Sequence, residues 1–185
     1  MGDSIGSLVE FQSEVSDEEV NKAMKMPGGG PFKLKPGQVT DDSELALCLA
    51  KGLAEGEGIF SLDRIAKYYG YWINSNPFDL GNTIRGALSA LLNQSDTNGI
   101  ERWGEICTAS ASKHNQKSES NGGLMRITPL AVFCAKLTNQ NDIEKVVRAE
   151  QALTHPNIMA QDAAIGYCLG LTHLINNVKK SIFCS

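Results

Sequence analysis

The apolar residues of this chain recur at three- and four-residue intervals along most of its length, which is the spacing of a helix face. The clearest face comprises Ile59, Leu62, Ile65, Ala66, Tyr69, Trp72 and Ile73. The next segment repeats the pattern with Ile84, Ala87, Leu88, Leu91 and Leu92. Strand-like alternation is scarce, and the connections are rich in Gly, Pro, Asn and Ser. The sequence therefore predicts an all-α domain.

Several residues predict where helices begin. Ser16 is followed three residues later by Glu19, which is a capping-box signature. Pro129 is suited to the first turn of a helix that starts after Thr128, and a further helix is expected after Asn141 or Asp142. Residues 156–176 are apolar on most sides and contain Gly166 and Gly170, which predicts a central helix packed closely by its neighbours. Residues 26–39 and 113–123 are predicted to be long loops.

Length and composition indicate one globular domain over residues 1–185. A formal net charge of -4 gives no electrostatic reason to expect direct contact with nucleic acid or an anionic membrane. The longest strongly apolar stretches, residues 163–171 and 87–92, are shorter than the run of about 20 residues that crosses a bilayer, so we expect no membrane span. The sequence does not specify an oligomeric state.

The cysteines indicate a reducing compartment. The sequence has 5 of them, widely spaced and without a Cys-x-x-Cys pair. Cys48, Cys134 and Cys168 lie in apolar helical stretches, where a cysteine usually acts as a small buried hydrophobe. Because the first residues carry Asp3 and Glu10 in place of a basic and then apolar leader, no secretory signal is visible, and we expect an intracellular, cytoplasmic protein.

The strongest candidate for chemistry is the cluster Thr40, Asp41 and Asp42, at the point where a loop becomes a helix. Hard cations such as Mg²⁺ take oxygen ligands, and these are three oxygen donors in consecutive positions. The alternative is that an acid caps the helix, because a carboxylate satisfies free backbone N–H groups there. One Asp is enough for a cap, so the residues alone leave metal binding and capping about evenly balanced.

Other segments carry candidates that are weak when taken singly. Gly2 and Gly6 flank Asp3, and Glu10 follows; Asp79 lies in a turn before a helix. Residues 120–129 join the second long loop to a helix whose amides could bind an anion, although composition alone favours a Gly-rich turn with a helix cap. His155 precedes Pro156 at a helix start, where it could cap the helix or offer a neutral imidazole to a ligand.

Taken together, four motifs resemble the ADP-ribosylglycohydrolase family over essentially the whole chain. They are Gly2-Asp3-Ser4-Ile5-Gly6 with Glu10, Thr40-Asp41-Asp42-Ser43, Asn121-Gly122-Gly123-Leu124-Met125-Arg126, and Thr154-His155. The resemblance implies a compact orthogonal helical bundle. It also implies a glycosidase that removes ADP-ribose from a protein side chain or a related acceptor, with two Mg²⁺ ions as cofactor.

The resemblance also implies roles for individual residues. Thr40, Asp41 and Asp42 are the expected metal ligands. Glu10 matches a catalytic acid or base, and Asp79 matches a carboxylate near the ribose. The expected ADP-ribose contacts are Asn121, Gly122, Gly123, Met125 and His155. Arg126 is expected to hold the loop without touching substrate.

The chain departs from the family pattern at its ends. The second acidic motif of the family, Asp-x-Asp followed by Thr or Ser, does not occur after Thr40-Asp41-Asp42. We therefore expect a partial, incomplete domain that is truncated at both ends and lacks the C-terminal metal-binding segment. Two alternatives to an active glycosidase follow from this: a module that binds ADP-ribose without cleaving it, or an inactive relative with a structural or interaction role.

Overall fold

The computed structural model describes residues 1–94 and 102–183, with the side chains of 179–183 left out. Within this part the chain is helical; it forms no strand there, only an isolated backbone bridge between Gly29 and Leu34. The elements are α1 (Gly2–Gly6), α2 (Asp17–Ala23), α3 (Asp41–Ala54), α4 (Leu62–Asn74), α5 (Asn82–Leu88), η1 (Ser89–Leu91), α6 (Trp103–His114), α7 (Thr128–Cys134), α8 (Gln140–Gln151) and α9 (Ile158–Phe183). The prediction of an all-α fold is confirmed.

The local signals for helix starts correspond to real contacts. The Ser16 hydroxyl accepts a hydrogen bond from the Glu19 amide at 3.3 Å, and the Ser16 amide donates to the Glu19 carboxylate at 2.9 Å, so the capping box is complete. Pro129 lies in the first turn of α7. Helix α8 begins at Gln140, slightly before the predicted position, because the Asn139 side chain accepts from the Asn141 amide at 2.9 Å.

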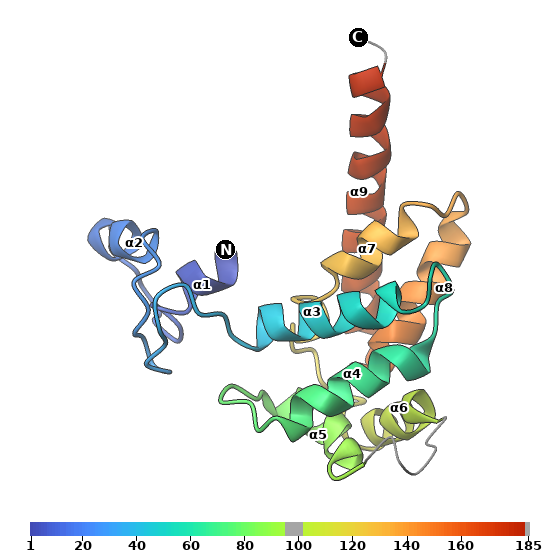
Figure 1. The fold of residues 1–185 in the computed structure, drawn as a ribbon, viewed down its shortest axis with the longest axis horizontal. Coiled ribbons are helices and arrows are strands. Elements are labelled where there is room, and N and C mark those ends of the chain that lie inside the picture. The colour runs from blue at the N-terminus through green and yellow to red at the C-terminus, as the bar shows by residue number, and fades with distance from the viewer. Residues whose placement is uncertain (95–101, 184–185) are drawn as a thin grey trace.

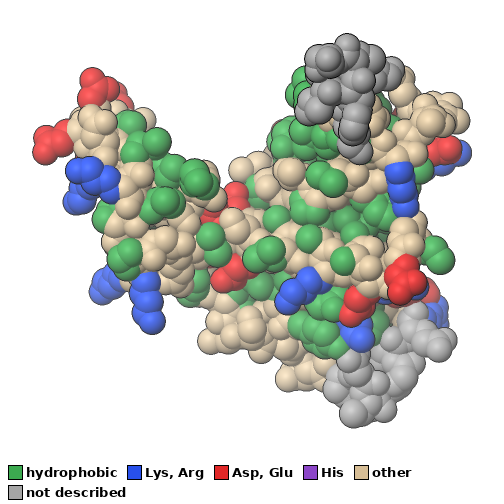
Figure 2. All heavy atoms as spheres, turned by 45° about the horizontal axis from the view of Figure 1, so that its top comes forward, with side chains coloured by type: hydrophobic (Ala, Val, Ile, Leu, Met, Phe, Trp, Pro, Cys, Tyr) green, Lys and Arg blue, Asp and Glu red, His purple; other side chains and the backbone are tan. Residues whose placement is uncertain are grey.

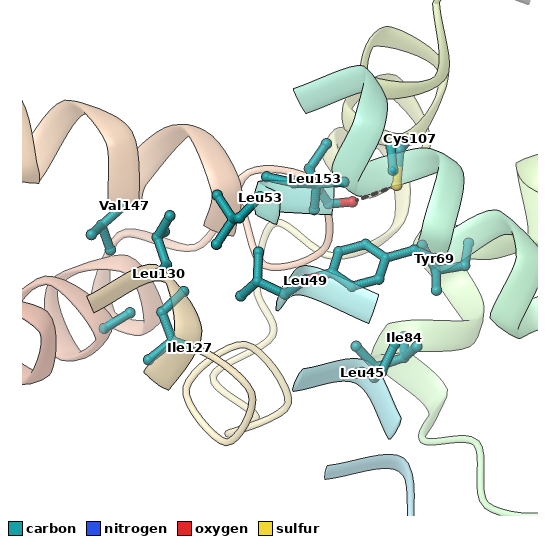
Figure 3. Close-up of a cluster of buried hydrophobic side chains, with 14 of the residues drawn as sticks. Leu45, Leu49, Leu53, Tyr69, Ile84, Cys107, Ile127, Leu130, Val147 and Leu153 are labelled. Carbon is teal, nitrogen blue, oxygen red and sulfur yellow. Dashed lines mark hydrogen bonds between the residues drawn. The ribbon is translucent and has the colours of Figure 1, made fainter. Parts of the chain in front are cut away.

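The helices from α3 onward form the body of the molecule (Figure 1). Helix α3 packs against α4 and α7, α6 packs against α4 and α5, and α9 packs against α7 and α8. The core between them is aliphatic and aromatic, and Figure 3 shows α3 contributing Leu45, Leu49 and Leu53 to it. In the same view the Cys107 thiol donates to the backbone carbonyl of Leu153 at 3.0 Å, which ties α6 to the end of α8. Cys184 lies outside the described residues.

The predicted face of α4 is largely correct. Ile65, Ala66, Tyr69, Trp72 and Ile73 are all buried. Ile59 is 68% exposed because it precedes Ser61, which caps the helix. The periodicity therefore identified the helix face, and its error lies at the boundary.

Helix α9 differs from the prediction of a closely packed central helix. Its C-terminal part extends beyond the body (Figure 1), and Tyr167, Leu174 and Val178 are exposed. No atom lies within 4 Å of a methyl group placed on Gly166 or Gly170, so no neighbour approaches closely there. The prediction was wrong for this face because α7 and α8 cover only the other side of the helix.

The same helix corrects the expectation that no apolar stretch is long enough to span a membrane. The segment Ile158–Val178 has 21 residues and a mean hydropathy of 1.2, and is long and apolar enough by length and composition alone. Only 28% of it is buried in the described structure. A core helix of a soluble protein can be equally long and apolar, so these two properties alone do not identify α9 as a membrane span.

Residues 1–38, here called the N-terminal arm, lie to one side of the body (Figures 1 and 2). The arm is folded back on itself: the Ser4 hydroxyl donates to the Gly37 carbonyl at 3.1 Å, and a methyl group on Gly30, whose φ is +67°, would overlap the Ser7 carbonyl oxygen. Within the arm, Phe11 contacts Phe32 edge to face at 5.9 Å, and Phe32 makes a second edge-to-face contact at 5.6 Å with Phe78 of the body. The arm thus brings its first residues to the start of α3.

Candidate active site

A pocket of about 500 Å³ lies where the N-terminal arm meets the body. Its lining consists of Glu10, Phe11, Asp41, Asp42, Asp79, Gly81, Asn82, Thr83, Ile84, Ser120, Asn121, Gly122 and Met125. Four of these are carboxylates, Glu10, Asp41, Asp42 and Asp79, which we call the acidic rim. The pocket therefore brings together seven of the ten residues that the sequence analysis named. The remaining three, Thr40, Gly123 and His155, lie next to it without lining it.

The start of α3 is capped by a residue from the arm. The Asp3 carboxylate accepts hydrogen bonds from the Thr40 amide at 3.0 Å, the Thr40 hydroxyl at 2.9 Å and the Ser43 amide at 3.1 Å. Burial alone would raise the pKa of Asp3, but these hydrogen bonds lower it, so the carboxylate stays ionised. Since Asp3 supplies the cap, capping does not account for the pair Asp41 and Asp42.

The acidic rim concentrates negative charge. Asp41 is only 8% exposed, and its pKa is raised to about 7, first by burial and then by the charges of Asp79 and Asp42. Burial is also the main cause that raises the pKa of Asp42, Asp79 and Glu10. Among the described residues no Lys, Arg or His forms an ion pair with the rim. Carboxylates that lie close together without basic partners repel one another, and a bound cation would offset this repulsion.

The donor chemistry of this wall fits Mg²⁺, which prefers carboxylate and hydroxyl oxygens. The arrangement is not a closed metal site, since the described part of the chain contains no group of three or more His, Cys, Asp or Glu placed to hold an ion. The assignment of Thr40, Asp41 and Asp42 as metal ligands stays a prediction.

The pocket is also lined by the turn at residues 121–125, which is closed by a hydrogen bond from the Met125 amide to the Asn121 carbonyl at 2.9 Å. Two buried side chains hold its backbone. Arg126 Nη1 donates to the Gly122 carbonyl at 2.6 Å, and Gln151 Nε2 donates to the Gly123 carbonyl at 3.1 Å. Arg126 therefore supports the turn from below, as the resemblance implied.

The two glycines of this turn are required by close packing. A methyl group on Gly123 would overlap Oε1 of Gln151, an atom that has no hydrogen-bond partner among the described residues. A methyl group on Gly122 would lie 3.2 Å from the His155 ring. The turn thus lies directly on these side chains, with no room for a Cβ at Gly123 and little at Gly122.

Beneath the turn lies a set of polar side chains that are almost wholly buried, which we call the buried polar network: Tyr69, Arg126, Glu150, Gln151, Thr154 and His155. Arg126 pairs with Glu150 at 3.0 Å, and the Tyr69 hydroxyl donates to Glu150 at 2.7 Å. Burial alone would lower the pKa of Arg126, but Glu150 and Tyr69 raise it, so the guanidinium is charged. In contrast to the acidic rim, these charges are paired.

His155 belongs to this network and reaches the pocket only through another residue. It is fully buried, with Nδ1 2.8 Å from the Thr154 hydroxyl and Nε2 3.0 Å from the Ser120 hydroxyl. Its pKa is lowered to about 3, mainly by burial and further by Arg126. The ring is therefore neutral, and its predicted contact with ligand stays a prediction.

Several site residues were not identified from the sequence. Asp3 stood in a quoted motif without a role, and its capping of residues 37 or more positions away has no local signal. Thr83, Ser120 and Phe11 line the pocket, but single hydroxyl or aromatic residues carry no periodic pattern. Glu150 lies among surface acids in the sequence, and only its burial shows its function in the fold.

The fold and the pocket define a class of all-helical proteins in which carboxylates from separate segments and a glycine turn line one pocket. The sequence profile of ADP-ribosylglycohydrolase matches residues 1–183, and the chain belongs to that family.

Individual relatives agree with this assignment. A protein of Acanthamoeba polyphaga mimivirus named as an ADP-ribosyl glycohydrolase is 36% identical over 186 residues, covering 95% of this chain and 52% of the viral protein. The ADP-ribosyl-[dinitrogen reductase] glycohydrolase of Rhodospirillum rubrum is 34% identical, covering 96% and 54%. An ADP-ribosylarginine hydrolase of Serratia proteamaculans is 30% identical, covering 95% and 45%.

A solved structure described as an ADP-ribosylglycohydrolase-related protein complex superposes with a TM-score of 0.66 at 26% identity, covering 92% of this chain and 51% of the other. The chain thus spans about half the length of the relatives that it matches.

Proposed function

We propose that this chain forms the part of an ADP-ribosylglycohydrolase that binds ADP-ribose and cleaves its glycosidic bond to a protein side chain, in a Mg²⁺-dependent reaction. One observation carries the proposal: the acidic rim and the turn at residues 121–125 both line a single pocket. The names and functions of the family relatives support the choice of ADP-ribose as ligand.

The acidic rim supplies the chemistry. In hydrolysis a water oxygen bonds to the anomeric carbon, the glycosidic bond breaks, and the leaving atom takes a proton. Glu10 is suited to hold that proton, because its pKa is raised by burial and by the charges of Asp79, Asp42 and Asp3. Asp79, on the same pocket, is suited to stabilise positive charge that develops on the ribose.

Thr40, Asp41 and Asp42 would hold Mg²⁺, with further ligands completing the coordination. When bound, the ion would polarise ribose hydroxyls and offset the negative charge of the rim. The residues of this chain provide the rest: Asp3 keeps Thr40 and the start of α3 in place, and the turn at residues 121–125 provides backbone amides for the diphosphate.

For the acceptor we propose arginine. The Serratia proteamaculans relative is named as an ADP-ribosylarginine hydrolase. The chemistry of the pocket agrees, since the leaving group would be a guanidinium and Glu10, Asp42 and Asp79 are carboxylates that attract a cation.

The second candidate is a module that binds ADP-ribose without cleaving it. The specific observation in its favour is that the described residues do not by themselves form a closed metal site. The two candidates differ in turnover and share the binding of ADP-ribose.

The test is a calorimetric titration of ADP-ribose with and without Mg²⁺. We expect Mg²⁺ to tighten binding to the wild-type chain and to have no effect on the Asp41→Ala/Asp42→Ala variant. The matched control is Asp17→Ala/Glu18→Ala, which removes two adjacent, exposed acids from the start of α2, away from the pocket. Equal binding of ADP-ribose in all samples would rule out Asp41 and Asp42 as ligands of Mg²⁺.

Turnover separates the candidates. A synthetic ADP-ribosylarginine peptide should release ADP-ribose with the wild-type chain, and Glu10→Gln should stop the release while ADP-ribose still binds. Binding without release by the wild-type chain would favour the binding module.

A further inference from the structure

A continuous series of hydrogen bonds runs from the buried ion pair to the pocket. It starts at Arg126, whose Nη2 lies 3.0 Å from Glu150 and also donates to the Thr154 hydroxyl at 2.7 Å. The Thr154 hydroxyl contacts His155 Nδ1 at 2.8 Å. On the other side of the ring, His155 Nε2 contacts the Ser120 hydroxyl at 3.0 Å, and Ser120 is part of the pocket lining.

The guanidinium determines the direction of the protons. Arg126 can only donate, so the Thr154 oxygen is an acceptor in that contact and its single proton remains available for another partner. The acceptor within reach is His155 Nδ1, and no other acceptor of this hydroxyl is found among the described residues. If Nδ1 carried a proton instead, the Thr154 hydroxyl proton would be buried without a partner, which is costly.

The neutral ring therefore carries its proton on Nε2 and donates it to Ser120. Burial and the nearby charge of Arg126 lower the pKa of His155 to about 3, which is consistent with a neutral ring. Gly122 is part of the arrangement, because a methyl group there would lie 3.2 Å from Nε2 and Cε1.

The tautomer decides what Ser120 offers to the pocket. Because Ser120 accepts from His155, its own proton is available for another acceptor, and it is donated to the Thr83 hydroxyl at 3.0 Å. Thr83 in turn lies 2.7 Å from the Ser118 hydroxyl, and either oxygen can be the donor there; when Ser118 donates, the Thr83 proton is available to the pocket. With the opposite tautomer the Ser120 proton would be held by the histidine. Asn115 holds both ends of this series, since its Nδ2 donates to the backbone carbonyls of Thr83 and Thr154.

We propose that Thr154 and His155 are positioning residues that set the direction of the hydrogen bonds from the Arg126–Glu150 ion pair through Ser120 to Thr83, so that the Thr83 hydroxyl, which accepts from Ser120, donates its own proton to a ligand oxygen in the pocket. The identity of the ligand rests on the proposed function, which makes the acceptors the ribose or diphosphate oxygens of ADP-ribose. The tautomer itself does not depend on any ligand.

The first test is the ¹⁵N NMR signature of the three imidazole rings in the full chain, with His155 assigned through His155→Asn. We expect the wild-type protein to carry the His155 proton on Nε2, with Nδ1 accepting a hydrogen bond. Thr154→Val should abolish the Nδ1 hydrogen-bond shift, and Thr154→Ser should retain it. A wild-type ring with its proton on Nδ1 would overturn the proposal.

The matched control is Thr172→Val. Thr172 is also buried, and its hydroxyl donates to the Ala131 carbonyl at 3.2 Å, away from the series. Like Thr154→Val, Thr172→Val removes one buried hydroxyl. It should therefore lower the free energy of unfolding by a similar amount, but leave the His155 signals unchanged. A change of the His155 signals in both variants would indicate general loosening of the core and would contradict a specific transmission through Thr154.

The second test is the affinity for ADP-ribose measured by calorimetry. Thr154→Val should weaken binding about tenfold, the loss expected for a misdirected hydrogen bond, while Thr154→Ser and Thr172→Val stay near wild type. An altered tautomer with unchanged affinity would overturn the positioning role. A wild-type chain that binds no ADP-ribose would instead overturn the proposed function, and the NMR result would still decide the tautomer.

Discussion

The acidic rim lines the pocket and the buried polar network supports its glycine turn, but the two regions differ in how their charges are compensated. The rim gathers Glu10, Asp41, Asp42 and Asp79 without basic partners among the described residues. The network buries Arg126 completely but pairs it with Glu150 and surrounds the pair with donors and acceptors. The buried polar network is therefore organised to hold a fixed geometry, whereas the acidic rim keeps uncompensated negative charge and so is suited to a cation.

The largest effect is expected from breaking the ion pair of the network. Glu150→Ala leaves the Arg126 guanidinium buried without its counter-charge and removes the acceptor of the Tyr69 hydroxyl. We expect the free energy of unfolding to fall by about 3–5 kcal/mol, measured by urea denaturation followed by circular dichroism.

The control for this change is the double variant Arg126→Met/Glu150→Leu, which removes both charges from the buried site together. It should cost less than Glu150→Ala, because no uncompensated charge remains. If Glu150→Ala cost no more than an ordinary surface substitution, the network would not be the fixed part of the site.

A smaller effect is expected where the turn rests on the network. In Gly123→Ala the new methyl group overlaps Gln151 Oε1, and Gln151 cannot move without losing its bonds to the Gly123 carbonyl and to Glu150. The expected loss is about 1–3 kcal/mol in the same unfolding assay. Gly6→Ala serves as control, since no atom lies within 4 Å of its added methyl group, and it should change stability by less than about 0.5 kcal/mol.

The pH dependence of stability is a further property of the buried polar network, through His155. The pKa of His155 is about 3 in the folded chain, below the ordinary value of 6.5, so between these values the unfolded chain binds a proton that the folded chain does not. This histidine therefore lowers stability as the pH falls from 6.5 toward 3, by at most about 1.4 kcal/mol per pH unit.

Carboxylates also titrate in this range, so the measured quantity is the difference between the wild-type chain and His155→Gln in unfolding experiments from pH 7 to pH 4. The difference should shrink or reverse as the pH falls. His173→Gln, which makes the same substitution at an exposed histidine of α9, is measured beside it as the control. An equal slope in wild type and His155→Gln would contradict a buried neutral ring.

The sequence predicted the helices well, because a helix face is encoded by spacing of three and four residues and by local caps. The face of α4 and the capping box at Ser16 and Glu19 are both correct. The predictions that failed concern which elements pack against a helix face. The exposure of Gly166 and Gly170 on α9 could not be predicted, because periodicity shows that a surface is apolar without showing what covers it.

The candidate site was predicted in part for the same reason. Motifs identified the segments that meet at the pocket, since each is a short local pattern. The contacts between segments were not predictable: the carboxylate of Asp3 caps a helix 37 residues away, and Tyr69 and Glu150 meet Arg126 through the fold alone. The sequence likewise suggested a ligand role for His155, which stays a prediction, but it did not show that the ring contacts Thr154 in the network and Ser120 in the pocket lining.

The smallest effect in the comparison is expected at the rim and has the opposite sign. In Asp42→Asn one of the crowded charges is removed while the shape of the side chain is kept, so the repulsion with Asp3 and Asp41 falls. Without Mg²⁺ the variant should be more stable than wild type by about 1 kcal/mol or less, and the gain should diminish in high salt, which screens the remaining charges. The control is Asp17→Asn at the start of α2, where the lost charge favours the helix dipole, so that variant should be slightly less stable than wild type. Mg²⁺ should raise the melting temperature of the wild-type chain and of Asp17→Asn, but not of Asp42→Asn. If Asp42→Asn were instead less stable than wild type in the absence of Mg²⁺, the rim carboxylates would stabilise the fold, as the residues around Arg126 do. The contrast between the two regions would then be wrong.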